Sequence, residues 1–174
     1  MFARLSNSLI GALLAMLALC ATGTWNAAAA DEPAAKPKAD AIKVVYHADF
    51  ADPRRFSAML TNVYNMVATY QGELTDYDVR IVFVSWGIRF VTRDKLAGTP
   101  FAEDAALKER RENLLGRLAT LRDTYGVKLE LCGITREQIG LDEKKVIPGV
   151  AIVRSGVARI AELQHRGFAY IKVE

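Results

Sequence analysis

The chain has 174 residues, of which 51% are hydrophobic, 25% charged and 9% aromatic, with 12 glycines, five prolines and two cysteines. These values exclude a disordered polymer, a disulfide-rich miniprotein and a collagen-like repeat. The 23 basic and 20 acidic side chains nearly cancel and leave a formal net charge of +3 at pH 7. This charge is too small to indicate binding to nucleic acid. The composition predicts a single folded domain.

The first 30 residues are typical of a secretory signal peptide. Arg4 precedes an apolar run over residues 9–20, and small residues follow, ending in Ala28-Ala29-Ala30 before Asp31. The run is shorter than the roughly 20 apolar residues that span a membrane. We therefore expect cleavage near Ala30, export to the periplasm and no stable membrane insertion of the mature protein. Retention of the segment as an N-terminal anchor is the alternative.

Cleavage after Ala30 would leave Cys132 as the sole thiol of the mature protein. A solitary cysteine has no partner for an internal disulfide bond. Its sulfur must therefore be buried as a small hydrophobic group, joined to another molecule or used in a reaction. A reactive or sulfur-carrying cysteine is the leading hypothesis, and a buried inert cysteine is the alternative.

Residues 31–41 are polar and contain two prolines, which is typical of a flexible leader, so the folded domain is expected over residues 42–174. Short apolar runs predict five strands, at residues 42–46, 79–84, 127–131, 150–153 and 168–173. Apolar spacing, N-caps at Asp52 and Ser155 and stops at Gly72 and Gly126 predict three longer helices, at residues 53–72, 102–124 and 156–165. Two shorter helices are expected, at residues 92–96 and 135–139.

Strands that alternate with helices predict a three-layer α/β/α fold with a mainly parallel five-stranded sheet, flavodoxin-like in outline. Ligands of such folds usually bind at the carboxyl ends of the strands. Four segments follow predicted strands in this way: His47-Ala48-Asp49, Ser85-Trp86-Gly87, Cys132-Gly133 and Arg154-Ser155-Gly156. We therefore expect a thiol, an imidazole, an indole and a hydroxyl at one edge of the sheet.

Cys132 is the main candidate for chemistry. A thiol between a strand and a helix start faces unpaired backbone N–H groups and the positive end of the helix dipole, which lower its pKa from about 8.5. Gly133 would let the sulfur of another molecule approach the backbone closely. Thr135 and Arg136 follow in the same turn and are pocket candidates. Arg136 could favour the thiolate, although a solvated helix face is the simpler explanation for this arginine.

Three further residues are candidates for the pocket around the thiol. His47 could hydrogen-bond the sulfur or its acceptor if the first and third strands are neighbours, or it could simply cap a loop. Trp86 could form an aromatic wall or belong to the core, and Ser155 could hold an anion or only cap its helix. No metal site is expected from two histidines without a Cys-x-x-Cys pair, and no glycine motif indicates a nucleotide cofactor.

Several stretches resemble the DsrE/DsrF-like family of sulfur-relay proteins. The similarity lies in residues 43–47 (KVVYH), 131–141 (LCGITREQIGL), 146–150 (VIPGV), 155–158 (SGVA) and 167–172 (GFAYIK). The resemblance implies that Cys132 holds sulfur as a persulfide and that the domain assembles into homotrimers or hexamers. The sequence departs from the family where Ile134 replaces a frequent asparagine, and in its export, because the best-known relay members are cytoplasmic.

The resulting hypothesis is a periplasmic carrier or sensor of sulfane sulfur rather than a turnover enzyme. Cys132 would take the outer sulfur of a persulfide or polysulfide and pass it to a partner thiol, with donor and acceptor unspecified. The alternative is a small-ligand-binding or assembly module with an inert cysteine. Met59, Tyr64, Met66 and Tyr70 leave more than one face of the first predicted helix apolar, which favours a subunit interface.

Overall fold

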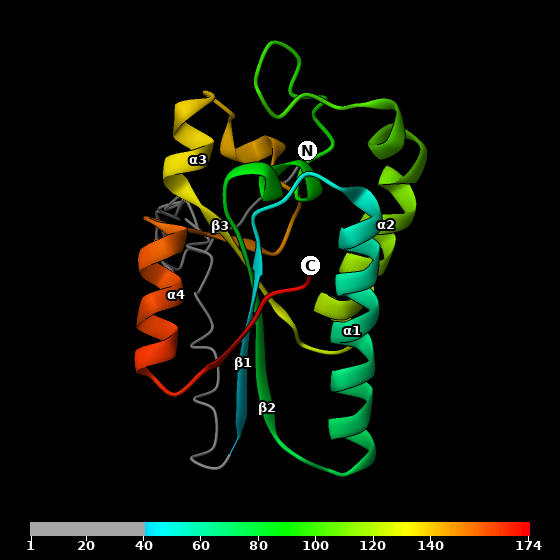
Figure 1. The fold of residues 1–174 in the computed structure, drawn as a ribbon, viewed down its shortest axis with the longest axis vertical. Helices are drawn as coiled ribbons and strands as arrows, with labels where there is room; N and C mark the ends of the chain where they lie inside the picture. Colours follow the sequence, from blue (N-terminus) through cyan, green and yellow to red (C-terminus); the bar gives the residue numbers. More distant parts are fainter. Residues whose placement is uncertain (1–40) are drawn as a thin grey trace, which may run out of the picture. The chain divides into compact units, whose positions relative to one another are not determined.

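The computed structural model describes residues 41–174 (Figure 1). The predicted signal peptide with its cleavage site, and all but the last residue of the leader, lie outside these residues. The strands are β1 (Ile42–Ala48), β2 (Tyr77–Phe83), β3 (Lys128–Cys132), β4 (Val150–Val153) and β5 (Ala169–Ile171). The α-helices are α1 (Pro53–Gly72), α2 (Ala105–Asp123), α3 (Gly133–Gln138) and α4 (Gly156–His165), with 3-10 helices η1 (Ser85–Phe90) and η2 (Glu143–Lys145).

Most of the predicted elements are confirmed. β4 and α4 have the predicted bounds, and Ser155 and Asp52 cap α4 and α1 by accepting hydrogen bonds from backbone N–H groups of the first turn. The helix predicted at residues 92–96 is wrong. There the Thr92 hydroxyl and the Asp94 carboxylate accept hydrogen bonds from backbone N–H groups two residues further on, and such local bonds compete with helix formation.

The five strands form one parallel sheet in the order β4-β3-β2-β1-β5. The predicted α/β class with a five-stranded parallel sheet is confirmed. Within that class the strand order differs from the order 2-1-3-4-5 of flavodoxin. As a result β2 separates β1 from β3, whereas β3 and β4 are neighbours.

Helices cover the two faces of the sheet unequally. α1 and α2 lie side by side on one face, and α4 lies on the other (Figure 1). The chain crosses the sheet from β1 to β4 in one direction and then returns to β5 beside β1. Because crossovers between parallel strands are right-handed, the return places α4 on the face opposite α1 and α2.

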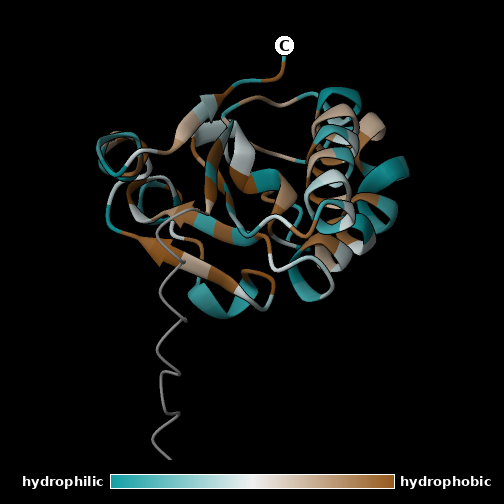
Figure 2. Ribbon diagram, turned by 90° about the horizontal axis from the view of Figure 1, so that it is seen from below, coloured by the Kyte–Doolittle hydropathy of each residue, from teal (hydrophilic) through white to brown (hydrophobic). Residues whose placement is uncertain are grey.

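The main apolar core lies beneath α1 and α2. Phe56 of α1 stacks on Phe90 with ring centroids 4.1 Å apart and meets Phe83 of β2 edge-on. The α4 face holds a smaller buried cluster, made of Val45, Val82, Ile160, Leu163 and Phe168. Figure 2 shows hydrophobic stretches in the strands, while the helices mix hydrophobic and hydrophilic residues. Within residues 41–174, no helix has the length and apolar character to cross a membrane.

Candidate functional site

Cys132 is the last residue of β3 and the N-cap of α3. Leu129 and Leu131 belong to the core beneath α1 and α2, so the alternation of the strand turns Cys132 toward the α4 face. Cys132 as a whole residue is 4% exposed. The fold therefore places this sulfur where β3 ends, directly before one helix start.

Four donor groups at two helix starts lower the pKa of the Cys132 thiol, although its sulfur makes no helix-capping hydrogen bond. Three belong to α3: the backbone N–H groups of Ile134 and Thr135, and the Thr135 hydroxyl. The fourth is the backbone N–H of Gly156, the first residue of α4. Burial raises the pKa of Cys132, but these donor groups outweigh burial and hold the pKa below its ordinary value. The surroundings of the sulfur therefore favour the thiolate.

Glycine allows the two helix starts to close around Cys132. A Cβ atom at Gly156 would lie 2.6 Å from Cγ2 of Val84 and 3.0 Å from Cβ of Cys132, closer than side chains approach one another. A Cβ atom at Gly133 would lie 3.0 Å from the carbonyl oxygen of Val153 in β4. Gly133 is thus packed against β4, and its part in admitting a second sulfur stays a prediction.

Thr135 and Arg136 follow Cys132 in α3 but face different groups. Thr135 is 5% exposed, and its Oγ1 accepts a hydrogen bond of 3.1 Å from the backbone N–H of Ser85. Arg136 donates to the carbonyl oxygen of Leu141 at 2.8 Å and lies 3.3 Å from the carboxylate of Glu143. Thr135 therefore ties α3 to the turn after β2, whereas Arg136 ties α3 to η2.

His47 lies on β1, two strands away from Cys132 along the sheet. Its strand β1 is separated from β3 by β2, so the condition for contact with Cys132, neighbouring strands, is not met. The imidazole Nδ1 lies 3.0 Å from the Tyr170 hydroxyl of β5, and Nε2 lies 4.0 Å from Asp49. Burial lowers the pKa of His47, Asp49 opposes that shift, and Lys172 adds to it.

The remaining predicted pocket residues have local partners. Trp86 in η1 is 37% exposed and packs edge-on against Phe101, with ring centroids 5.3 Å apart. The Ser155 hydroxyl oxygen accepts a hydrogen bond of 3.3 Å from the backbone N–H of Ala158. This contact is the helix cap that the sequence predicts, and an anion-binding role of Ser155 stays a prediction.

Sequence reasoning missed a network of ionic side chains on the α4 face. Glu130, two residues before Cys132, is 4% exposed and accepts two hydrogen bonds from Arg159 of α4, at 2.7 and 2.9 Å, and one from Arg80 of β2 at 2.7 Å. Arg80 also binds both carboxylate oxygens of buried Asp78. Burial raises the pKa of Glu130, but the two guanidinium groups outweigh burial and keep it below its usual value.

A sequence signal for this network exists. Charged residues occupy alternate positions of two buried strands, Asp78 and Arg80 in β2, and Lys128 and Glu130 in β3. Lys128 completes the set with a 3.1 Å hydrogen bond to Asp78. Because alternate residues of a strand share one face, this pattern places all four charges on the same side of the sheet.

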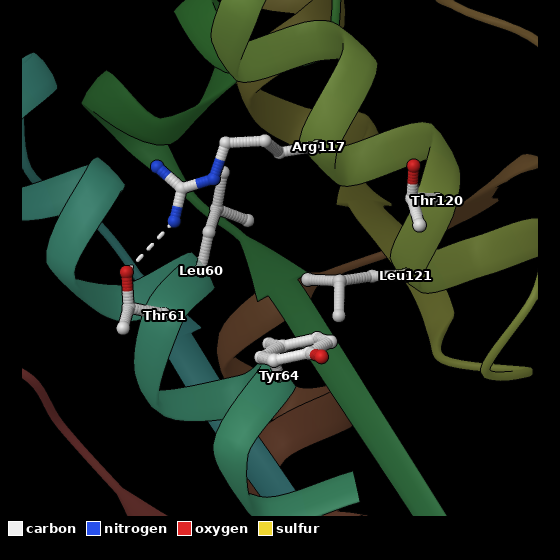
Figure 3. A pocket seen from close by; sticks show the side chains of 6 residues that line it. All are labelled: Leu60, Thr61, Tyr64, Arg117, Thr120 and Leu121. Carbon is white, nitrogen blue, oxygen red and sulfur yellow. Dashed lines mark hydrogen bonds between the residues drawn. The ribbon is translucent and has the colours of Figure 1, made fainter. Parts of the chain in front are cut away.

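A cavity of about 190 Å³ lies between α1 and α2, on the face opposite Cys132. Figure 3 shows its lining, with a guanidinium that donates to the hydroxyl of Thr61 at 2.8 Å. The lining residues are Leu60, Thr61, Tyr64, Arg117, Thr120 and Leu121. The cavity is therefore separate from the thiol site. Over residues 41–174, no three His, Cys, Asp or Glu side chains gather in a way that could hold a metal ion.

Comparisons with known proteins agree with this architecture. The chain matches the model of the DsrE/DsrF-like family over residues 26–173. It is similar to MTH1491 of Methanobacterium thermoautotrophicum, described as a protein of unknown function, with 27% identity, a TM-score of 0.57 and coverage of 75% of this chain and 98% of that one. The ychN protein of E. coli has 17% identity, a TM-score of 0.42 and the same coverage. No curated protein matches the chain. The protein therefore belongs to the DsrE/DsrF-like family, which is associated with sulfur relay.

Proposed function

We propose that this protein carries sulfane sulfur as a persulfide on Cys132 and passes it to a partner thiol. The observation that carries the proposal is the place of Cys132 at the carboxyl end of β3, against the starts of α3 and α4, where the pKa of its thiol is lowered. The thiolate is the form of cysteine that attacks sulfur, so donors that stabilise the thiolate prepare Cys132 for the reaction.

The chemistry is an exchange between sulfur atoms. In loading, the Cys132 thiolate attacks the outer sulfur of a persulfide, the bond between the donor's two sulfurs breaks, and the electron pair leaves with the donor thiolate. In release, an acceptor thiolate attacks the outer sulfur on Cys132, and the electron pair returns to Sγ. Atoms and electrons balance in both steps without an oxidant or reductant, and a leaving thiol of low pKa speeds release.

A competing candidate is a binding or assembly module in which the cysteine is inert. One observation favours it: Cys132 as a whole residue is only 4% exposed. Small sulfur species such as polysulfide reach a nearly buried thiol more readily than a folded partner protein does. Polysulfide should therefore modify Cys132 if the protein is a carrier and leave it unmodified if the cysteine is inert.

Mass spectrometry after incubation with inorganic polysulfide separates the candidates. A carrier gains the mass of one sulfur atom, about 32 Da, on the peptide that contains Cys132, and dithiothreitol removes it. A Cys132→Ala variant is the control, because it should gain nothing at this peptide. A wild-type protein that remains unmodified under conditions that persulfidate free cysteine would favour the inert module and reject the carrier.

We also propose that the mature protein works in the periplasm as a homo-oligomer. The support for export is the signal-peptide pattern of residues 1–30. The support for assembly is Tyr64 of α1, which is 46% exposed, although Met59, predicted with it, is buried in the core. Cell fractionation and light scattering of the purified protein test the two statements, and a cytoplasmic or monomeric protein would reject them respectively.

A further inference from the structure

The cavity between α1 and α2 combines apolar walls with one charged group. Figure 3 shows the Arg117 guanidinium and the Tyr64 ring on opposite sides of this space, with Leu60 and Leu121 between them. Tyr64 packs edge-on against the ring of Tyr125, with centroids 5.4 Å apart, which supports that wall of the cavity. Sites for small molecules have this composition, because apolar walls supply contact area and a few polar groups orient the ligand.

Oxygen atoms of α1 hold the Arg117 side chain in place. Nη1 donates a hydrogen bond to Oγ of Ser57 at 2.6 Å, and Nη2 donates to the Ser57 carbonyl oxygen at 3.0 Å and to Oγ1 of Thr61 at 2.8 Å. A guanidinium has five N–H groups. Three of them make these bonds, so two have no hydrogen-bond partner among residues 41–174. The cavity therefore contains a positioned cation that can donate further hydrogen bonds.

Arg117 also differs from the other partly buried arginines of the protein in having no counter-ion. Arg80, Arg111 and Arg159 each pair with a carboxylate at 2.7 Å, whereas no carboxylate of residues 41–174 pairs with Arg117. The sequence explains the difference, because neither α1 nor residues 113–121 of α2 contain an aspartate or a glutamate. A guanidinium whose charge is met only by neutral oxygen atoms is suited to binding an anion from outside the chain.

We propose that this cavity binds a small organic acid, with its carboxylate against Arg117 and its apolar body against Leu60 and Leu121. The cavity measures about 190 Å³, and a cavity of about 150 Å³ is enough for benzene, so a ring or chain of about six carbons fits. A concave space of this size with a single cation suits a small ligand better than a flat subunit face. The site lies on the face opposite Cys132 and does not depend on the sulfur-carrier function.

Benzoate is a suitable probe, because it joins a six-carbon ring to a carboxylate. Backbone amide shifts of the isotope-labelled protein, followed by NMR during a titration, give both the affinity and the place of binding. We expect saturable shifts at Thr61 and Thr120, with a Kd of about 1 mM or lower, as is ordinary for a ligand of this size. Benzamide has the same shape without the charge and should bind about tenfold more weakly.

Two variants separate the charge from the space. Arg117→Gln removes the cation and should raise the Kd for benzoate at least about tenfold, as loss of a hydrogen bond between charged groups predicts. Thr120→Trp fills the cavity from an exposed position of α2, leaves Arg117 in place, and should weaken binding by at least as much. Arg93→Gln is the matched control, because Arg93 is exposed and pairs with Glu112 outside the cavity, so its Kd should equal that of wild type.

Each of three outcomes overturns the proposal. The first is the absence of saturable shifts at the cavity in the wild-type protein. The second is an equal Kd for benzoate in wild type and Thr120→Trp, a comparison that also holds if Arg117→Gln does not fold. The third is an oligomer that becomes monomeric in light scattering when Arg117 or Thr120 is substituted, because a second copy of the chain would then be the occupant of the cavity.

A further measurement distinguishes the cavity from the thiol site. The pH profile of Cys132 alkylation by iodoacetamide should be the same with and without saturating benzoate, because the cavity and the thiol lie on opposite faces of the sheet. A benzoate-dependent profile would place the ligand at the thiol and reject the cavity as its site. A protein that takes up no sulfur rejects the carrier function, whereas saturable benzoate binding in that protein still supports the cavity site.

Discussion

The face of the sheet beneath α1 and α2 is apolar, whereas the face beneath α4 carries paired charges beside Cys132. Aromatic and aliphatic side chains fill the first face, with the Phe56 and Phe90 rings stacked at its centre. On the second face, buried Asp78 and Glu130 are held by Arg80 and by cations of β3 and α4. Two surfaces of one sheet thus have different physical roles.

Apolar burial stabilises a fold roughly in proportion to area and has little directional preference. A buried ion pair contributes less net free energy, since removing charges from water offsets their attraction, but its geometry is strict. Glu130 accepts two hydrogen bonds from Arg159 of α4, three residues after Gly156, and a Cβ atom at Gly156 would lie 3.0 Å from Cβ of Cys132. The apolar face therefore supplies stability, while the charged face holds α4 in place over the thiol.

Phe56→Ala tests the apolar face and should have the largest effect on stability. Phe56 is fully buried between Phe83 and Phe90, so truncation leaves a cavity in the core. We expect a loss of about 4 kcal/mol in the free energy of unfolding, measured by urea denaturation. The alkylation profile of Cys132 in the folded protein should be unchanged. A raised thiol pKa in this variant would contradict the division between the faces.

Arg80→Met tests the charged face. The substitution leaves Asp78 and Glu130, 3% and 4% exposed, with only Lys128 and Arg159 as partners. We expect a loss of about 3 kcal/mol by the same measurement, because buried carboxylates become undercompensated. Unlike Phe56→Ala, it should also shift the alkylation profile of Cys132. A loss below about 0.5 kcal/mol would show that the network behaves like exposed ion pairs.

The fold was predictable because its signals are local. Ser155 and Asp52 mark helix starts through their own side chains, and apolar spacing defines α1 and β4 within short windows. Residues 92–96 were mispredicted because Thr92 and Asp94 bind nearby backbone groups, which overrides their apolar neighbours. Helices and strands can be predicted from a short stretch of sequence where one local interaction dominates. The prediction fails where side chains bind backbone groups that a helix would use.

For the thiol site, only the contacts between residues close together in the sequence could be predicted. The position of Cys132 directly before a helix could be inferred because β3 and α3 are continuous in sequence. The Gly156 donor could not, since it requires β4 beside β3, and strand order is a tertiary property. The same holds for the bond between Glu130 and Arg159, 29 residues apart. Strand order also separates His47 from the thiol, a separation that chain order leaves hidden.

Acid should weaken the charged face selectively. Asp78 and Glu130 have pKa values below their ordinary ones: burial opposes this shift, but hydrogen bonds from their cationic partners outweigh it. Their contribution to stability is therefore fully present above the unfolded-state pKa of about 4, and it is lost as pH falls below about 4 toward the folded values. Urea midpoints measured from pH 7 to pH 3 should show this loss.

Glu130→Gln is the matched variant for the acid experiment. The amide cannot ionise, so this variant should be less stable than wild type at pH 7 but lose less stability between pH 5 and pH 3. Equal losses in the two proteins would assign acid sensitivity to exposed carboxylates such as Asp104, whose pKa is also lowered, chiefly by its hydrogen bond from Arg89.

Gly156→Ala tests whether the charged face places α4 over the sulfur. The added methyl group would meet Val84 and Cys132, so the start of α4 must move outward. We expect a loss of about 2 kcal/mol in stability, typical of overpacking, and a raised pKa of Cys132 because one donor withdraws. Gly72→Ala is a suitable control, since open space surrounds that position. Unchanged alkylation in Gly156→Ala would show that α4 contributes nothing to the thiolate.

Tyr170→Phe should have the smallest effect and defines the boundary of the thiol site on the α4 side. The substitution removes the hydroxyl that lies 3.0 Å from Nδ1 of His47, at an exposed edge strand, so about 1 kcal/mol or less is lost. Because β2 stands between His47 and Cys132, alkylation of the thiol should keep its wild-type pH profile. A His47→Gln variant provides the second check on the same contact. A shift of the thiol pKa in both variants would mean that the edge formed by β1 and β5 couples to the sulfur, and the site would then extend across the whole sheet.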